Sequence, residues 1–250
     1  MRYALYYAPE RDSRLWKKLC CWFGRDPETN QPVDRPAVKG ISPDRLIDLT
    51  KTPARYGPHA TLKAPFRLHS DMHISLLTQR LEEFCAGFYS FALPQLTIAC
   101  IDNFFCLVPD EYSIILQKLA DQCVREFDRF RAPLTPLEKA RRRAAILSDK
   151  EKHYLQRWGY PYVLDCYRFH ITLTARIHNQ AERNRVLWAI THEFDDILKD
   201  EPVRLNGISL FVEPEPGMPF QLKQRFPCAS APVENAQATR ELNNEIMLNL

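Results

Sequence analysis

Glycine is scarce in this sequence, at 7 of 250 residues, whereas proline occurs 19 times. No glycine-rich segment of the phosphate-loop or dinucleotide-binding type is present, which excludes the usual backbone sites for nucleoside triphosphates and dinucleotides. The frequent prolines indicate many boundaries between strands and loops, and the few glycines indicate that few turns depend on them.

The sequence also lacks a strong charge and long apolar runs. Its formal net charge of +3 is too small to predict a nucleic-acid surface over the whole molecule, so any anion site must be local. The apolar start at residues 3–8 is too short to span a membrane and is followed by a proline. We therefore expect a strand there, and neither a leader nor a membrane anchor.

The cysteines form no Cys-x-x-Cys pair and show no zinc-ligand spacing; they stand at positions 20, 21, 85, 100, 106, 123, 166 and 228. Without a signal peptide, they are interpreted as small buried hydrophobic residues of a cytoplasmic protein. With 45% hydrophobic and 26% charged residues, the chain has an ordinary globular composition. Its length allows one large domain or two lobes of about 100 residues each.

Two short segments have nearly the same pattern: His59-Ala60-Thr61-Leu62 and, 111 residues later, His170-Ile171-Thr172-Leu173. In a strand, residues i and i+2 share a face, so each segment presents an imidazole beside a hydroxyl and turns its apolar residues toward a core. For either motif alone, a buried histidine bonded to its threonine is the simpler interpretation. The matched pair favours a chemical role.

The chemistry that suits this set is phosphodiester cleavage. One histidine deprotonates the attacking water and the other protonates the leaving oxygen, while the threonine hydroxyls donate hydrogen bonds to the non-bridging phosphate oxygens. We therefore predict His59, Thr61, His170 and Thr172 as catalytic residues. No metal and no cofactor is required.

Two cations are predicted to bind the substrate. Alternation along the first motif strand, which is expected to end near Pro65, places Lys63 on the face of His59. The second motif strand is expected over residues 169–177 and places Arg176 on the face of His170. A solvent-exposed lysine at a sheet edge remains an equal alternative for Lys63. Tyr6 or Tyr7 of the first strand borders the site, but the pattern leaves open which one.

The rest of the chain alternates strands and helices. Helices are expected over 11–23, from Ser42, from Ser70 to residue 88, over 111–130, and from the capping positions Thr135, Ser148 and Asn179; strands are expected over 96–101, 103–108, 203–211 and 220–226. Each motif strand is thus followed by a helix and two strands, which indicates an internal duplication. The predicted fold class is α+β with antiparallel sheets.

Three segments are predicted to lie outside this repeat. The proline-rich stretch 24–40 is a loop and a candidate flap near the site. The basic run at 139–143 lies in a helical connector and is interpreted as a solvated face in preference to a nucleic-acid stripe. The chain beyond residue 228 is a tail, frayed or forming a docking helix.

With these features, the sequence resembles the 2H phosphoesterase superfamily, and most closely the 2H-like proteins associated with phosphonate-utilisation operons. The likeness rests on the two motifs, on residues 55–66 around the first of them and on Phe211-Val212-Glu213-Pro214. It covers residues 1 to about 228 and implies a single bilobal domain: a first lobe at about 1–130, a helical connector at 131–160 and a second lobe at 161–228, with the motifs lining the cleft between the lobes.

The resemblance also implies a function. It predicts a metal-independent cyclic phosphodiesterase acting on a small cyclic phosphate, with 5-phosphoribosyl 1,2-cyclic phosphate as the favoured substrate. Two alternatives stay open: an enzyme that processes or ligates RNA with 2′,3′-cyclic phosphate ends, and a non-catalytic module that binds nucleotide or RNA. RNA is a less favoured partner than a small molecule, and the sequence gives no oligomeric state.

Overall fold

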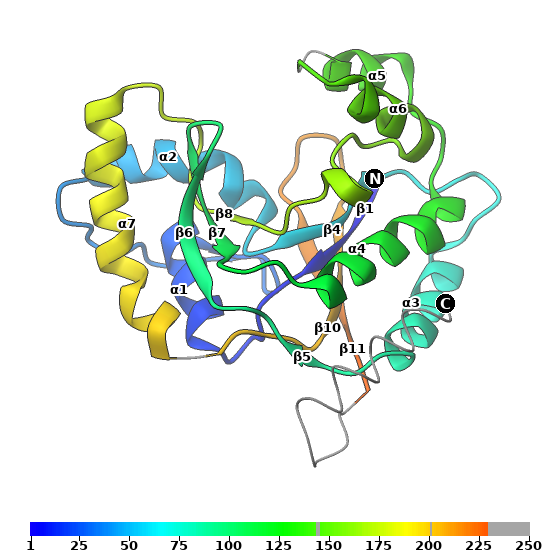
Figure 1. The fold of residues 1–250 in the computed structure, drawn as a ribbon, viewed down its shortest axis with the longest axis horizontal. Coiled ribbons are helices and arrows are strands. Elements are labelled where there is room, and N and C mark those ends of the chain that lie inside the picture. The colour runs from blue at the N-terminus through cyan, green and yellow to red at the C-terminus, as the bar shows by residue number, and fades with distance from the viewer. Residues whose placement is uncertain (144–145, 201, 230–250) are drawn as a thin grey trace.

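The computed structural model describes residues 1–143, 146–200 and 202–229 of the chain. It shows an α+β protein whose largest sheet has seven strands in the order β11-β10-β1-β4-β8-β7-β6, with every registered pairing antiparallel (Figure 1). The strands of this sheet are β1 Arg2–Tyr7, β4 Ala60–Phe66, β6 Leu96–Ile101, β7 Phe104–Pro109, β8 Ile171–Thr172, β10 Gly207–Glu213 and β11 Gln221–Pro227.

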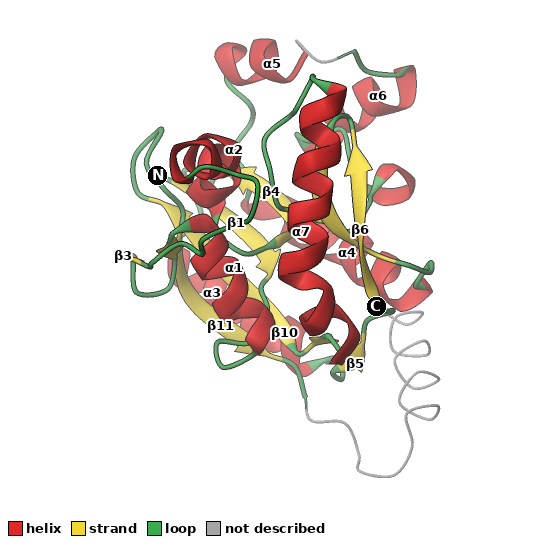
Figure 2. Cartoon of the chain, turned by 90° about the vertical axis from the view of Figure 1, so that its left-hand side faces the viewer, coloured by secondary structure: helices red, strands yellow, loops and turns green. Residues whose placement is uncertain are grey.

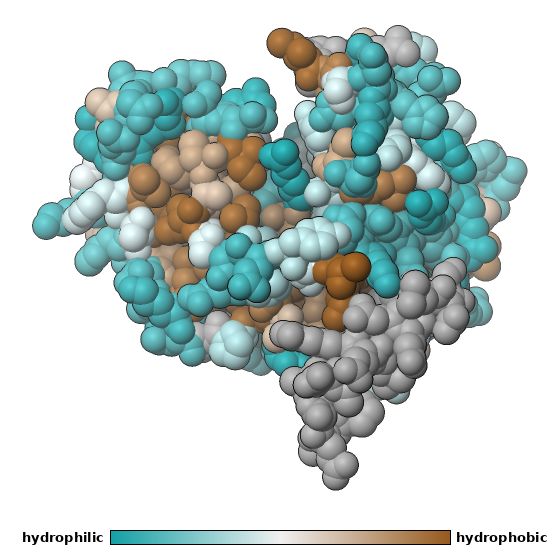
Figure 3. Space-filling model, viewed as in Figure 1, coloured by the Kyte–Doolittle hydropathy of each residue, from teal (hydrophilic) through white to brown (hydrophobic). Residues whose placement is uncertain are grey.

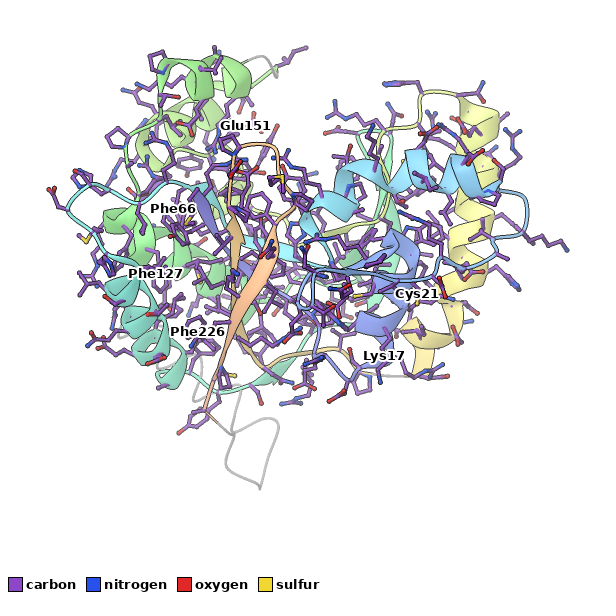
Figure 4. The ribbon with its side chains drawn as sticks, turned by 180° about the vertical axis from the view of Figure 1, so that it is seen from behind. Lys17, Cys21, Phe66, Phe127, Glu151 and Phe226 are labelled. Carbon is purple, nitrogen blue, oxygen red and sulfur yellow. The ribbon has the colours of Figure 1, made fainter. Side chains whose placement is uncertain are left out.

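Two groups of helices pack with the sheet strands and with one another. Those of ten residues or more, and the connector helix α5, are α1 Arg14–Phe23, α2 Pro43–Tyr56, α3 Ile74–Ala86, α4 Ile114–Glu126, α5 Pro136–Arg143, α6 Asp149–Trp158 and α7 Gln180–Asp200. Helix α4 packs on β4, and α3 packs on β10 and β11. Helix α1 packs against α2 and α7, and α7 lies along β6 (Figure 2). Figure 4 shows Phe66, Phe127 and Phe226 on the side of α3 and α4, and Lys17 and Cys21 on α1.

Local sequence explains most helix ends. Ser13, Ser42 and Ser113 each accept a hydrogen bond from a backbone N–H of the first turn, and Ser148 forms the predicted reciprocal capping box with Glu151. Two predicted starts are wrong by a few residues: α3 begins at Ile74 after a His73 cap in place of Ser70, and α4 begins after Ser113 in place of residue 111. Those stretches leave the helix because an alternative capping side chain follows them.

The predicted duplication is confirmed in the order of the elements. The first half runs β4, α3, β5 (Phe91–Ala92), β6, β7, and the second runs β8, α7, β9 (Arg204–Leu205), β10, β11. Even the short strands β5 and β9 correspond, and they pair with each other. The hairpin β6–β7 turns at Asp102 and Asn103, both with positive φ, as a tight two-residue turn requires.

The structure differs from the expected pair of separate sheets. Strands β4 and β8 are neighbours in one continuous sheet, joined through the registered pair Ala60 and Ile171. The first half's hairpin β6–β7 extends the sheet beyond β8, and β1 lies between β4 and β10. The motif strands therefore lie side by side at the centre of one sheet. One face of this sheet takes the place of the cleft that was expected between two sheets.

Two further expectations concern the flanking segments. The 24–40 loop contains the short hairpin β2 (Arg25–Asp26) and β3 (Gln31–Pro32), and Arg25 and Arg35 bond it to backbone carbonyls of α1 and α2 and of Phe220. The predicted tail lies, apart from Ala229, outside the described residues. None of the helices in the described ranges combines the length with the hydrophobicity that a membrane span needs.

Candidate active site

The four motif side chains form one compact group because of strand register. Strands β4 and β8 are antiparallel with Ala60 opposite Ile171, so one step in either direction sets His59 opposite Thr172 and Thr61 opposite His170. Ala60 and Ile171 are fully buried in the core, and the four motif residues therefore share the other face. Directly opposite residues of such a pair are about 5 Å apart at Cβ. Each imidazole thus lies beside the hydroxyl of the other motif.

Both histidines are held in the same way. The Nδ1 atom of His59 lies 2.9 Å from the carbonyl oxygen of Gly57, and that of His170 lies 2.9 Å from the carbonyl oxygen of Arg168. A carbonyl can only accept, so Nδ1 carries the hydrogen in each ring and Nε2 is left for chemistry. The equivalent bond, to the residue two positions earlier, gives the two motifs one geometry.

Burial sets the protonation of this pair. It lowers the pKa of His59 to about 4; the bond to Gly57 opposes this fall, and the proximity of His170 adds to it. Burial also lowers the pKa of His170, with Arg168 contributing both an opposing carbonyl bond and a repulsive charge. Both rings are therefore neutral near pH 7, and each Nε2 is an acceptor in the free protein.

A cavity of about 600 Å³ opens beside the motifs. Thr61 and His170 line it, together with the β6–β7 turn, α6 and the segment that leads into β8. Figure 3 shows the surface hollowed at the top, between α5–α6 and the β6–β7 side of the molecule, and Figure 4 places Glu151, another lining residue, on α6 near this opening. The cavity is lined by the aromatic residues Phe104, Tyr160, Tyr162 and Tyr167.

A larger hollow of about 880 Å³ lies between α5 and α6, but neither motif lines it. Because the larger hollow contains none of the motif residues, the smaller cavity, which contains Thr61 and His170, is the candidate site. Among the residues that the structure describes, no three His, Cys, Asp or Glu side chains are grouped as metal ligands would be.

The predicted place of Lys63 is wrong. Tyr6 pairs with Thr61 and Leu5 pairs with Lys63, so one step on β1 matches two on β4. This β-bulge breaks the alternation and turns Lys63 to the face opposite Thr61. Its ammonium is buried there, 3.3 Å from Asp128 and 3.1 Å from the Val124 carbonyl oxygen at the end of α4. Burial lowers its pKa to about 8, against the opposing charge of Asp128.

Arg176 does line the cavity, although not through strand alternation. Strand β8 ends at Thr172, because the N–H groups of Leu173 and Thr174 both bond to the Phe105 carbonyl and that of Ala175 bonds to Leu49. Thr174 is buried and accepts from the Phe105 N–H. The Arg176 side chain is 61% exposed and reaches the cavity rim, with Asp102 at 3.9 Å.

The sequence left the choice between Tyr6 and Tyr7 open and gave Glu213 no role. Tyr6 is the cross-strand neighbour of Thr61, and its ring centroid lies 4.0 Å from that of His59. From the sequence, either Tyr6 or Tyr7 could have faced the site, because neighbouring strand residues point to opposite faces. The register of β1 against β4 shows that Tyr6 is the one on the side of Thr61.

Glu213 has a buried carboxylate, which pairs with Arg2 and with Arg55 just before the first motif. Nothing in the local pattern of residues 211–214 indicates this pairing. It joins segments more than 150 residues apart in the sequence.

Comparison with known proteins matches residues 61–221 to a family model described as a protein of unknown function, DUF1045. The chain belongs to this family. The match spans β4 to the start of β11 and so contains Thr61 and the whole second motif. The family description names no activity.

Two curated relatives extend the similarity. The chain is 38% identical over 231 residues to a protein of Janthinobacterium sp. (strain Marseille), covering 90% of this chain and 50% of that protein. It is 36% identical over 222 residues to a protein of Laribacter hongkongensis (strain HLHK9), covering 89% and 50%. Both are named ribose 1,5-bisphosphate phosphokinase PhnN. The DUF1045 chain thus spans about half the length of the curated relatives it matches.

Proposed function

We propose that this DUF1045 protein is a phosphoric diester hydrolase that opens a small cyclic phosphate by acid–base catalysis. The observation that supports this most is the crossed arrangement of the motifs: His59 opposite Thr172, Thr61 opposite His170, and both Nδ1 atoms fixed by equivalent carbonyl bonds. This arrangement resembles the paired His-x-Thr motifs of 2H phosphoesterases.

The reaction needs one proton to be removed and one to be supplied. The Nε2 of one histidine accepts a proton from water as its oxygen bonds to phosphorus, and the protonated Nε2 of the other gives a proton to the ring oxygen as the P–O bond breaks. Thr61 and Thr172 donate to the non-bridging oxygens, where negative charge must be held. The product is a phosphomonoester and a free hydroxyl group.

The free protein has both rings neutral near pH 7, so one imidazole takes up a proton from the solvent when the anionic substrate binds. The negative charge of a bound phosphodiester raises the pKa of the nearby imidazoles and favours the protonated form of one. The general acid should be the histidine that is less buried, because its protonated form is the less disfavoured of the two. The pKa of His59 falls to about 4, so we assign His170 as the acid and His59 as the base.

The proposed substrate is 5-phosphoribosyl 1,2-cyclic phosphate. The relatives' name gives ribose 1,5-bisphosphate as a kinase substrate, and opening the cyclic phosphate at the 2-oxygen yields that compound, whereas opening at the 1-oxygen yields the 2,5-isomer. The resemblance to phosphonate-operon proteins points to the same class of sugar phosphate. We therefore propose the 2-oxygen as leaving group.

The kinase activity in the relatives' name is not proposed for this chain. The chain matches only half of each relative, and the chain's sequence contains no glycine-rich phosphate loop. A diesterase half and a kinase half joined in one chain would carry out consecutive steps on one sugar.

A second candidate substrate is a 2′,3′-cyclic nucleotide or an RNA end of that type. The aromatic residues Phe104, Tyr160 and Tyr162 line the cavity, and the Phe104 ring lies 5.9 Å from that of His170 between centroids. Aromatic rings stack on nucleobases. A panel of substrates separates this candidate from the ribose phosphate.

The decisive experiment measures 31P NMR and initial rates for 5-phosphoribosyl 1,2-cyclic phosphate and for 2′,3′-cyclic nucleotides, with EDTA present. We expect ribose 1,5-bisphosphate as product, and His59→Ala and His170→Ala each to lower kcat by about 10² to 10⁴, the usual worth of a general acid or base.

His178→Ala is the matched control, because His178 is an exposed histidine that does not line the cavity. Wild-type rates in both motif variants would remove the catalytic role. Loss of activity in EDTA with rescue by a divalent ion would refute the metal-independent mechanism, and hundredfold better opening of the nucleotides would replace the proposed substrate.

A further inference from the structure

An arginine outside the cavity lining packs over Tyr160, a ring that lines the cavity. Arg142, in the basic run interpreted from sequence as a solvated face, is half-buried and packs 5.7 Å above the Tyr160 ring. Its guanidinium donates to the Pro65 carbonyl oxygen and has no carboxylate partner among the described residues. Burial lowers its pKa. A half-buried guanidinium without a counter-ion is costly unless an anion joins it.

Phenol hydroxyls gather at the same place. The Tyr6 side chain is 1% exposed, and within the described part of the chain its hydroxyl has no hydrogen-bond partner. Burial raises its pKa well above the usual value, and the phenols of Tyr56 and Tyr160 raise it further. The rings of Tyr6 and Tyr56 both lie against Phe220, with centroids 6.3 Å and 5.1 Å from it. Tyr56 also lies 5.7 Å from His59 between ring centroids.

This group adjoins the candidate active site. Tyr160, Ala64 and Val163 line both the main cavity and a small recess. Arg142 lines this recess together with Lys63 and Arg131, which both pair with Asp128. Thr61 connects the two regions, because it lines the cavity and is the cross-strand partner of Tyr6. An anion at the Tyr160 end of the cavity would therefore lie next to the scissile phosphate.

Charge distinguishes this end from the other. At the rim, Arg168 and Arg176 share the lining with Asp102, Glu151 and Asp165, so carboxylates offset the cations. At the Tyr160 end, Glu138 is near enough to raise the pKa of Arg142, but its carboxylate accepts hydrogen bonds from Arg67 and from the Thr135 backbone N–H.

The guanidiniums of Arg2 and Arg55 lie next to the phenols and share the single carboxylate of Glu213. With Arg142 added, the described groups of this end carry a net excess of positive charge.

We infer that Arg142 and the hydroxyls of Tyr6 and Tyr160 form a subsite for the terminal phosphate of the substrate. This inference rests on the proposed function and names how it selects a phosphorylated sugar. A guanidinium binds two phosphate oxygens at once, and phenols donate to a third without adding negative charge. The subsite takes over the role that the sequence assigned to Lys63, whose ammonium is bound to Asp128.

The test compares 5-phosphoribosyl 1,2-cyclic phosphate with ribose 1,2-cyclic phosphate, which lacks only the terminal phosphate. We expect Arg142→Gln to raise KM for the phosphorylated compound about 10- to 100-fold, as loss of a charged phosphate contact does, with little change in kcat. The kinetics of the unphosphorylated compound should stay the same. Tyr160→Phe, which removes only a hydroxyl, should raise the same KM several-fold.

Arg14→Gln is the matched control, because Arg14 pairs with Asp196 and Asp200 on the exposed side of α1. An equal loss for both compounds in Arg142→Gln would overturn the subsite, since Arg142 would then bind the scissile phosphate. A loss of selectivity in Arg176→Gln with none in Arg142→Gln would place the terminal phosphate at the rim and also overturn it.

If the wild type opens neither ring, the proposed function fails and the subsite is still tested. Calorimetric titration with ribose 5-phosphate and with ribose then decides. The subsite is supported if the wild type binds ribose 5-phosphate but not ribose, and if this binding is at least tenfold weaker in Arg142→Gln but not in Arg14→Gln. No binding to the wild type, or equal binding to Arg142→Gln, overturns it.

Discussion

At the level of single residues, the two histidines share one backbone contact but differ in their surroundings. His59 is enclosed by the rings of Tyr6 and Tyr56, whereas His170 faces the cavity beside Phe104. Apolar enclosure disfavours the imidazolium, so both pKa values fall below that of a free histidine. Near pH 7 the free protein thus holds two bases, and a bound anion favours the protonation that makes one of them an acid.

This predicts the pH dependence of kcat/KM. The productive free enzyme holds one protonated and one neutral histidine, and that form peaks between the two pKa values, of which one is about 4 and the other lies below the ordinary 6.5. The maximum of kcat/KM is therefore expected below pH 6.5, whereas kcat, which reports the complex, should peak at a higher pH. Initial rates are measured between pH 4 and 9 with ribose 1,2-cyclic phosphate, because it lacks the terminal phosphate that would titrate in this range. A kcat/KM that is flat or that peaks above pH 7 would contradict the predicted acidic maximum.

The position of Lys63 gives a second prediction. Lys63→Met should lower the free energy of unfolding by about 1–3 kcal/mol, less than for a wholly orphaned buried charge, because Asp128 keeps Arg131 at 2.8 Å. KM for the cyclic phosphate should not change. Denaturant unfolding and initial rates measure the two effects. Lys152→Met, at an exposed surface pair with Asp149, is the control, and a raised KM with unchanged stability in Lys63→Met would restore Lys63 to the site.

At the level of elements, one carboxylate ties three ends together. Glu213 closes β10 and pairs with Arg2 at the start of β1 and with Arg55 at the end of α2, while the Gly217 N–H donates to it. Helix α2 leads directly to Gly57, whose carbonyl orients His59. The position of the first histidine therefore depends on an ion-pair network formed across the sheet.

Glu213→Gln should therefore lower both stability and turnover. It leaves two guanidiniums without their charge partner, and we expect a loss of about 2–4 kcal/mol in the free energy of unfolding. Turnover should fall about tenfold because the His59 segment loses its anchor. Thermal or denaturant unfolding and kcat are measured side by side. Glu193→Gln on α7, which removes the charge partner of Lys18 on α1, is the control. An equal effect of the two changes on kcat would refute the positioning role.

At the level of the whole molecule, charge decides between a small substrate and RNA. The net charge is +3, and many of the described cations are already paired with carboxylates. An RNA enzyme would gain affinity from released counter-ions and lose it steeply with salt. We expect the protein to bind a 10-mer oligoribonucleotide with a Kd weaker than about 100 µM at 0.15 M salt. Fluorescence anisotropy from 0.05 to 0.3 M salt measures this, and micromolar binding with a steep salt slope would favour the RNA substrate.

The sequence by itself determined the features that local rules govern. The helices begin near residues that cap them, the β6–β7 hairpin turns at Asp102, and the order of strand, helix and two strands recurs in both halves. The two motifs can be recognised because hydrophobic alternation and side-chain chemistry are both written within four residues. For the same reason the sequence alone suggests the family resemblance and the two candidate histidines.

Only the tertiary structure decided what depends on register and distance. A bulge in β4 turns Lys63 and Thr61 to opposite faces. Strand β8 ends at Thr172, so the position of Arg176 at the cavity rim does not follow from strand alternation. Arg142 has the pattern of a surface residue in its own helix and lies over Tyr160 in the fold. Such outcomes arise from pairings between segments far apart in the chain, where a shift of one residue exchanges the two faces of a strand.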